Sequence, residues 1–260
     1  MKKILIISYY WPPNSGSGVQ RWLKFSKYLK KYKWHPIIVT PLNPYTELND
    51  TKLSEEIEDI DTIKLPIWEP YTLKDKVFGI SKKSQTSGII SKEKSIKDFC
   101  FNWIRGNFFI PDPKKYWISP TVRTLTKIIN DQKINYIVST GPPHSMHLIA
   151  LELKKTFKNL KWIADFRDRW SNLDLLDDFY LTKRSRKKHL ELEKKVLNFS
   201  DLVLTVSPKW AKEFIALGAL NVKVITNGYD EDDFLNFKIN STDKFIIGHY
   251  DVINHLRNPT

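Results

Sequence analysis

Cysteine is almost absent from this chain of 260 residues, in which Cys100 is the single example. An intrachain disulfide is therefore excluded, and so is a metal site built from several thiolates. Such sparing use of cysteine is typical of proteins in a reducing cytosol. Long apolar runs are missing too. Since no window approaches the ~20 apolar residues that cross a bilayer, any membrane contact is expected to be peripheral.

Acidic residues are the second scarcity. The sequence holds 29 Asp and Glu against 42 Lys and Arg, which gives a formal net charge of +13. A surface with this excess attracts polyanions or the anionic face of a membrane. Nucleic acid is the obvious competing partner, but the sequence carries no recognised nucleic-acid-binding motif, so we expect none to be bound specifically.

The residues that are present predict a folded α/β protein. Hydrophobic residues make up 41% of the chain and aromatic residues 13%, which is enough for a sizeable core. Apolar runs predict strands at residues 4–7, 37–40, 61–65, 136–139, 162–164, 202–206 and 222–225. Helical spacing predicts helices at 19–33, 145–157, 183–197 and 208–217. This alternation indicates a doubly wound, mostly parallel, Rossmann-like sheet.

The chain is expected to hold one complete domain. We expect residues 1–230 to form it, and residues 231–260 to be a linker followed by Phe245–Gly248, the first strand of a second domain whose remainder is absent. Residues 81–95 are rich in Lys and Ser and predict a mobile loop. The aromatic residues at 99–117 are expected in helices that close on the sheet, with a membrane-dipping surface as the alternative.

A glycine-rich turn follows the first predicted strand. Gly16, Ser17 and Gly18 stand between this strand and a basic helix that begins near Val19. Glycine lets the backbone approach a ligand closely, and the free N–H groups of a helix start favour a phosphate or carboxylate. The turn is therefore a candidate anion site. Alternatively, the glycines only permit a tight turn, because Gly-x-Gly without a third glycine is a weak dinucleotide signal.

A histidine follows the predicted strand at residues 136–139. Pro142 and Pro143 stiffen the turn and hold His144 at the edge of the sheet, just before a helix. There His144 can shuttle a proton, or bond a sugar hydroxyl or a phosphate. A packing or helix-capping role is the alternative for His144, and it is the expectation for His147.

The predicted strand at 162–164 ends in a densely charged loop, Asp165–Trp170. Arg167 is expected to bind a phosphate or to pair with Asp165. Asp168 is expected to accept hydrogen bonds from sugar hydroxyls, and Trp170 to offer a flat face to a ring. The alternative is an internal Arg–Asp pair that only holds the loop. Two aspartates offer too few oxygens for a hard cation, so no metal site is expected.

Two further segments carry weaker signals. Residues 183–189 form the most basic run, which predicts a solvated helix face, with membrane or nucleic-acid binding as the alternative. Asn227 and Gly228 are a turn signal suited to a hinge between two domains.

Taken together, six segments resemble the N-terminal domain of family 4-like glycosyltransferases of the GT-B class. They are Tyr9–Arg21 (YYWPPNSGSGVQR), Phe109–Trp117 (FIPDPKKYW), Ser139–Leu148 (STGPPHSMHL), Ile163–Trp170 (IADFRDRW), Asp201–Pro208 (DLVLTVSP) and Thr226–Phe234 (TNGYDEDDF). Because they span nearly the whole chain in the expected order, the match is far more specific than any one motif.

The resemblance implies two Rossmann-like domains that face each other. This chain would supply the acceptor-side domain, and the missing domain would bind a nucleotide-sugar donor. The implied reaction is retaining sugar transfer to a glycan or lipid-linked acceptor in surface polysaccharide or lipopolysaccharide biosynthesis, with no cofactor and no metal. The implied location is the cytoplasm, peripheral at the inner face of the cell membrane, where the cationic helices would dock on anionic lipid.

The resemblance also assigns roles to residues. His144 and Asp168 would line the cleft near the transferred sugar as catalytic residues. The expected substrate-binding residues are Gly16, Ser17, Gly18, Arg21, Arg167, Trp170 and Asn227. Arg257 is the candidate for the donor phosphate, although Asp251 stands where the family has a glycine-containing turn.

The missing donor domain leaves two expectations for the isolated chain. It is either an inactive part of an enzyme that needs its C-terminal domain or a separate chain, or a non-catalytic module that binds a glycan, a phosphate or a protein partner.

Overall fold

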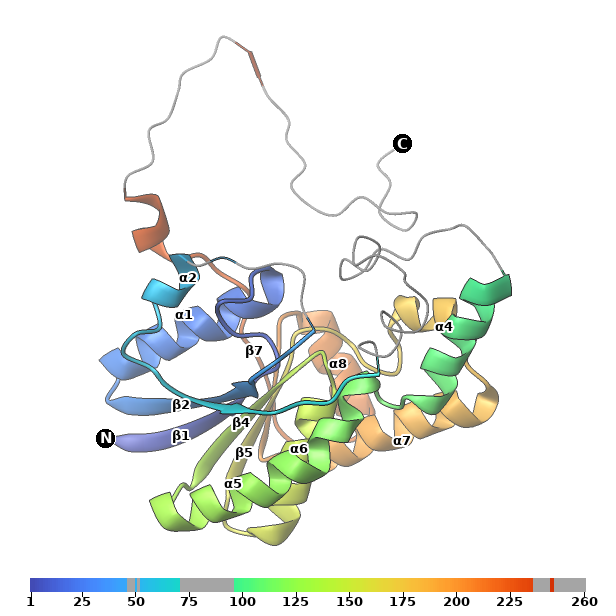
Figure 1. Ribbon diagram of the computed structural model, residues 1–260, viewed down its shortest axis with the longest axis horizontal. Coiled ribbons are helices and arrows are strands. Elements are labelled where there is room, and N and C mark those ends of the chain that lie inside the picture. The colour runs from blue at the N-terminus through green and yellow to red at the C-terminus, as the bar shows by residue number, and fades with distance from the viewer. Residues whose placement is uncertain (46–49, 51, 71–95, 236–243, 246–260) are drawn as a thin grey trace.

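A single sheet of seven strands organises the computed structural model, which describes residues 1–45, 50, 52–70, 96–235 and 244–245 (Figure 1). The strands are β1 (Lys2–Ile7), β2 (Trp34–Pro41), β3 (Asp61–Leu65), β4 (Tyr136–Gly141), β5 (Lys161–Phe166), β6 (Leu202–Thr205) and β7 (Val222–Val224). Their order is β3-β2-β1-β4-β5-β6-β7, and every neighbouring pair is parallel. The predicted Rossmann-like fold class is confirmed.

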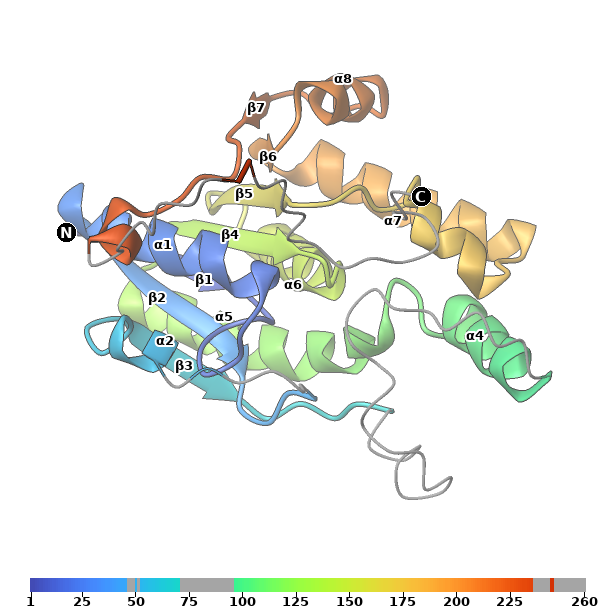
Figure 2. The same cartoon turned by 90° about the horizontal axis from the view of Figure 1, so that it is seen from above.

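Helices lie on both faces of this sheet (Figures 1 and 2). They are α1 (Ser17–Lys31), α2 (Lys52–Glu55), α4 (Ile96–Phe108), α5 (Ile118–Gln132), α6 (Ser145–Thr156), α7 (Lys183–Phe199) and α8 (Pro208–Ala216), with the 3-10 helices η2 (Pro113–Trp117), η3 (Asp174–Phe179) and η4 (Glu231–Phe234). The four helices predicted by residue range are confirmed, with ends displaced by two residues or fewer. The sheet is therefore doubly wound, as expected.

The side chains of β1 point alternately to the two faces of the sheet, so this one short strand contributes to two hydrophobic cores. Leu5 and Ile7 join the cluster that includes residues of α5, α6 and α7, whereas Ile4 and Ile6 join the cluster that includes residues of α1. Successive strand side chains point to opposite faces, so a strand covered on both sides is apolar at every position.

The aromatic segment divides between the core and the surface. Trp117 is completely buried in the core cluster, but Phe99 and Phe108 of α4 stay 47% and 60% exposed. The expected helices are present, yet α4 packs against η3 instead of closing on the sheet. Gly106 permits this contact, because a Cβ there would lie 2.6 Å from the Cβ of Phe179.

Some expectations lie outside the described residues. These are the loop at 81–95, the strand Phe245–Gly248 beyond its first residue, and Arg257. Among the helices that the structure describes, none is both long and apolar enough to span a bilayer.

Truncating a core side chain of β1 tests this architecture. Leu5 is fully buried, so Leu5→Ala should lower the free energy of unfolding by about 2–5 kcal/mol, measured by urea denaturation. The matched control is Leu220→Ala, because Leu220 is 89% exposed and its truncation should cost less than about 0.5 kcal/mol. Equal losses in the two variants would contradict the assigned core.

Candidate functional site

The predicted site residues converge where the order of the sheet reverses. β1 and β4 are neighbours, but the chain runs outward from β1 to β2 and β3, and outward from β4 to β5, β6 and β7. In doubly wound sheets, ligands bind beside such a point, outside the carboxyl ends of the strands. Gly16–Gly18 follow β1, His144 follows β4, Arg167–Trp170 follow β5, and Asn227 follows β7.

The glycine-rich turn forms the start of α1. Gly16 caps the helix with a φ of 107°, which favours glycine, and no side chain caps the helix start. Ser17 is the first residue of α1. At Gly18, a Cβ would lie 2.8 Å from Cδ2 of Tyr10 and 3.0 Å from Nη1 of Arg167. Gly18 therefore does more than permit a turn, since it lets a guanidinium approach the start of a helix.

Arg167 supplies the positive charge of this cradle. Its guanidinium lies 5.8 Å from the ring centre of Tyr10 and donates a hydrogen bond to the carbonyl of Pro142. Its Nε is buried and has no hydrogen-bond partner among the described residues. Burial lowers the pKa of Arg167 from its ordinary value, while Asp165 and Asp168 oppose that shift. We call the start of α1 together with Arg167 the anion cradle.

Asp165 is buried and internally paired. Its carboxylate accepts hydrogen bonds from Arg21 Nη2 (3.0 Å), Trp22 Nε1 (2.7 Å) and Thr140 Oγ1 (2.9 Å), and its side chain is 0% exposed. This agrees with the alternative of an internal Arg–Asp pair, but Arg21 supplies the guanidinium where the sequence had suggested Arg167. The carboxylate thus joins α1, β4 and β5.

Arg21 and Asn227 bind each other. Nη1 of Arg21 donates to Oδ1 of Asn227 at 3.2 Å and to the carbonyl of Thr226 at 3.3 Å. Both residues were expected to bind substrate. In this structure they fasten the expected hinge to the start of α1, beside the anion cradle.

His144 is held at the N-terminus of α6 in a neutral state. It is 6% exposed, and neither ring nitrogen has a hydrogen-bond partner in the described part of the chain. Burial lowers the pKa of His144 well below its ordinary value, with help from His147, His189 and Arg167, and the Arg169 backbone opposes the shift. An uncharged imidazole can act as a hydrogen-bond donor or as a base.

Trp170 is a support for His144. The two rings are parallel, with centroids 4.7 Å apart, and Trp170 is only 1% exposed. Its Nε1 donates to Nδ1 of His189 at 3.0 Å, and burial lowers the pKa of His189 to about 4. One face of the indole, which the sequence suggested for a sugar ring, is therefore covered by His144.

His147 packs behind His144 as expected. Ser139 Oγ accepts a hydrogen bond from Trp162 Nε1 (2.9 Å) and shares another with Nδ1 of His147 (2.8 Å). Burial lowers the pKa of His147 to about 3. A Cβ on Gly141 would lie 2.6 Å from Nε2, so this packing requires glycine at that position.

Asp112 is a positioning residue that the sequence analysis did not single out. Its carboxylate accepts from the backbone N–H and the hydroxyl of Ser145, at 2.9 and 2.8 Å, and from the backbone of Lys114. It thereby fixes the start of α6 directly after His144. An Asp followed by Pro113 is the signature of a helix cap and could have revealed it. Asp168 lies half-buried beside Arg167.

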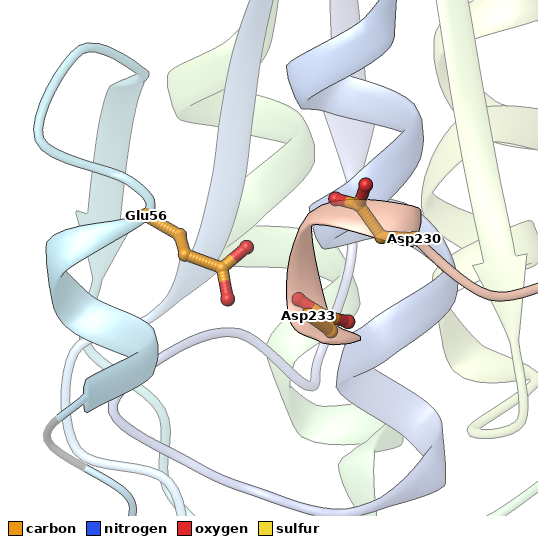
Figure 3. A group of neighbouring side chains, drawn as sticks. All are labelled: Glu56, Asp230 and Asp233. Atoms are coloured by element: carbon orange, nitrogen blue, oxygen red, sulfur yellow. The ribbon is translucent and has the colours of Figure 1, made fainter. Parts of the chain in front are cut away.

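The cationic face of α1 is largely neutralised within the molecule. The carboxylates of Glu56, Asp230 and Asp233 lie close together (Figure 3), and the ammonium of Lys24 is 2.7, 3.3 and 2.6 Å from them. A positive charge is thus already in place among these acids, so the cluster is an ion-pair network and carries no metal assignment.

The next turn of α1 continues this network. Lys27 contacts Asp230 (2.7 Å) and Asp232 (2.6 Å), and the hydroxyl of Tyr28 donates to Asp230. Although burial opposes the shift, these hydrogen bonds hold the pKa of Asp230 below its ordinary range. η4 is therefore fastened along α1, and these lysines are engaged within the protein instead of facing an external partner.

The parallel sheet and its strand order define a doubly wound, Rossmann-like domain. The model of the Glycosyltransferase Family 4 matches residues 91–233, more than half of the chain. The chain belongs to this family.

Solved structures resemble the chain in fold. Sucrose-phosphate synthase from Thermosynechococcus elongatus is 14% identical, with a TM-score of 0.50 over 89% of this chain and 49% of that one. A glycosyltransferase from Rickettsia africae is 16% identical, with a TM-score of 0.44 over 91% of this chain and 46% of that one. The chain thus spans about half the length of these two proteins. No curated protein sequence matches it.

Breaking the buried ion pair between Arg21 and Asp165 should lower the stability of the fold. Arg21→Gln leaves the Asp165 carboxylate buried without its cation, so the free energy of unfolding should fall by about 3–5 kcal/mol in urea denaturation. The control Arg186→Gln breaks an exposed pair with Asp177 and should cost less than about 1 kcal/mol. Similar losses in the two variants would contradict the larger contribution of the buried Arg21–Asp165 pair to stability.

The free energy of unfolding should also fall as the pH is lowered. His147 has a pKa of about 3 in the folded chain and ~6.5 when unfolded. Below pH ~6.5 the unfolded chain binds the extra proton, so stability present at pH 7 is lost progressively down to pH 3. For this one group the loss at pH 5 is about 2 kcal/mol.

Denaturant unfolding at pH 7 and pH 5, at constant ionic strength, measures this loss. His147→Asn keeps a hydrogen-bond acceptor near Ser139 but cannot titrate, so its stability should depend less on pH than that of the unchanged chain. The same pH dependence in both proteins would exclude His147 as a cause.

Proposed function

We propose that this chain is the acceptor-side domain of a retaining glycosyltransferase that uses a nucleotide-sugar. It transfers a hexose or related sugar to a glycan or lipid-linked acceptor in surface polysaccharide or lipopolysaccharide biosynthesis. The enzyme works in the cytoplasm, peripherally at the inner face of the cell membrane. The observation that carries this proposal is the anion cradle beside the buried, neutral His144, at the reversal point of the sheet.

The cradle suits the charge that develops during sugar transfer. When the bond between the sugar and the donor diphosphate breaks, negative charge grows on the leaving phosphate. Fixed dipoles and a guanidinium aimed at that position stabilise the transition state without reorganising. In this proposal the start of α1 and Arg167 supply that stabilisation, so the reaction needs neither a divalent metal nor another cofactor.

His144 and Asp168 act on the sugars in this proposal. The neutral imidazole of His144 bonds a hydroxyl of the transferred sugar, and the stacked ring of Trp170 holds it in place. Asp168 accepts a hydrogen bond from an acceptor or donor hydroxyl near Arg167. Arg21 and Asn227 bond each other beside the cradle and connect it to the expected hinge.

The donor side lies in the part of the enzyme beyond this domain. Since the chain spans about half of the solved proteins that it resembles, the second half would bind the nucleotide, with Arg257 as a candidate contact to the donor phosphate. The competing proposal is a non-catalytic module that uses the same cradle to hold a phosphorylated glycan.

Calorimetric titration separates these functions. The chain is titrated with a panel of nucleotide-sugars and free nucleotides, and then with phosphorylated glycans. Weak nucleotide binding by the chain alone, with sugar transfer once the donor half is supplied, supports the transferase. Tight glycan binding that never leads to transfer supports the binding module, and tight nucleotide binding by this chain alone overturns the assigned division between the two halves.

Removing either catalytic candidate should reduce transfer by the enzyme with both halves. His144→Ala and Asp168→Asn should each lower kcat about 100-fold or more, while the melting temperature reports whether the fold survives. The matched controls are His35→Ala and Asp177→Asn, because both residues lie on the surface away from the cradle. Undiminished turnover in either site variant removes that residue from the mechanism.

A further inference from the structure

α4 carries a row of apolar side chains that faces water. Ile96, Cys100, Ile104 and Phe108 recur every four residues, and all are exposed, with 84% at Ile96, 46% at Ile104 and 60% at Phe108. Residues four apart lie on the same side of a helix. Folded proteins in water leave few such continuous apolar rows uncovered, so the row marks an interaction surface.

α4 is fixed beside the first turn of α7. Asn107 donates to the carbonyl of Tyr180 and accepts from the backbone N–H of Thr182 at 2.8 Å. Thr182 is the residue that caps α7, and the ring of Tyr180 lies 4.6 Å from that of Phe99. The two figures show α4 at the periphery of the molecule, close to the beginning of α7 (Figures 1 and 2).

The first half of α7, whose cap residue Thr182 bonds Asn107 of α4, carries exposed positive charge. Its exposed basic residues are Lys183, Arg184, Arg186, Lys187 and Lys188. Arg186 pairs with Asp177 and Lys187 lies 4.0 Å from Glu191. The other three have no ion pair among residues 1–45, 50, 52–70, 96–235 and 244–245. This helix therefore differs from α1, where Lys24 and Lys27 are held by internal acids.

We propose that the apolar row of α4 and the free cations of α7, together the α4–α7 surface, bind an anionic lipid bilayer. The apolar side chains enter the boundary between headgroups and acyl chains, while Lys183, Arg184 and Lys188 contact the anionic headgroups. Charge complementarity selects this occupant, because an apolar row flanked by unpaired cations matches a negatively charged bilayer. The inference rests on the peripheral membrane association proposed above, for which it assigns the residues.

The single cysteine offers a direct measurement. Cys100 is exposed within the apolar row, so a polarity-sensitive thiol fluorophore reports on this row alone. Vesicles of phosphatidylcholine with 30% phosphatidylglycerol should shift its emission to shorter wavelength, and pure phosphatidylcholine should not. Vesicle binding without a shift would place the contact on another face and overturn the proposal. A shift that depends only on protein concentration would identify a second copy as the occupant, and would overturn it too.

Charge variants test the α7 side of the surface by vesicle co-sedimentation. The triple change Lys183→Gln, Arg184→Gln and Lys188→Gln should weaken partitioning to the anionic vesicles roughly 100-fold. The control Arg123→Gln, Lys127→Gln and Lys158→Gln removes the same charge from exposed residues outside α4 and α7 and should weaken it less than about fivefold. Equal losses would show that only the net charge matters, and would contradict the assigned surface.

Apolar variants test the α4 side. Ile104→Ser with Phe108→Ser should reduce partitioning at least tenfold, whereas the control Ile215→Ser with Leu220→Ser changes exposed side chains on and after α8 and should leave it unchanged. Melting curves verify the fold of each variant. These measurements use no sugar substrate, so failed vesicle binding with intact sugar transfer rejects this surface alone, and vesicle binding without transfer rejects only the transferase.

Discussion

The buried ion pair between Arg21 and Asp165 is the constraint on which the geometry of the site depends. A carboxylate removed from water is costly unless all its acceptor positions are satisfied. Here the donors come from α1 and from the end of β4, while Asp165 itself ends β5. These elements must be in register before the charge can be buried. The pair thus fixes the helix start that forms one wall of the anion cradle.

The site combines one positively charged side chain with several uncharged rings. Arg167 remains cationic, whereas burial keeps His144, His147 and His189 uncharged. A permanent cation beside neutral rings is suited to a ligand that is anionic at one end and hydroxyl-rich at the other. Arg167 and His144 lie outside the carboxyl ends of the strands, which is where doubly wound sheets bind their ligands.

The fold was largely predictable because its signals are local. Apolar strands covered on both faces and amphipathic helices are visible as periodic patterns, and Asp61–Leu65 was predicted residue for residue. The pairing inside the site was not predictable. That Arg21 instead of Arg167 reaches Asp165 depends on the angle of α1 over the sheet. Thr140 donates to the carboxylate because the β4–β5 register places it opposite Asp165.

The side-chain contacts of the loop after β5 were likewise not predictable from the sequence. The sequence could place Trp170 near the cleft, but whether its ring faced a ligand or a neighbouring side chain depended on the packing of α7. His189 of that helix accepts the indole N–H and turns the ring toward His144. The bond between Asp112 and Ser145 was not predictable because the two residues are 33 positions apart in the sequence.

Because η4 is bound along α1, the helix α1 links the site to the residues that follow β7. Fifteen residues make a rigid rod about 22 Å long. Its first turn lies beside Arg167, Arg21 bonds Asn227, and Lys24 and Lys27 pair with Asp233 and Asp230. One helix therefore connects the segment after β7 to the surroundings of Arg167, so a shift of residues 230–233 would displace both ends of the same rod.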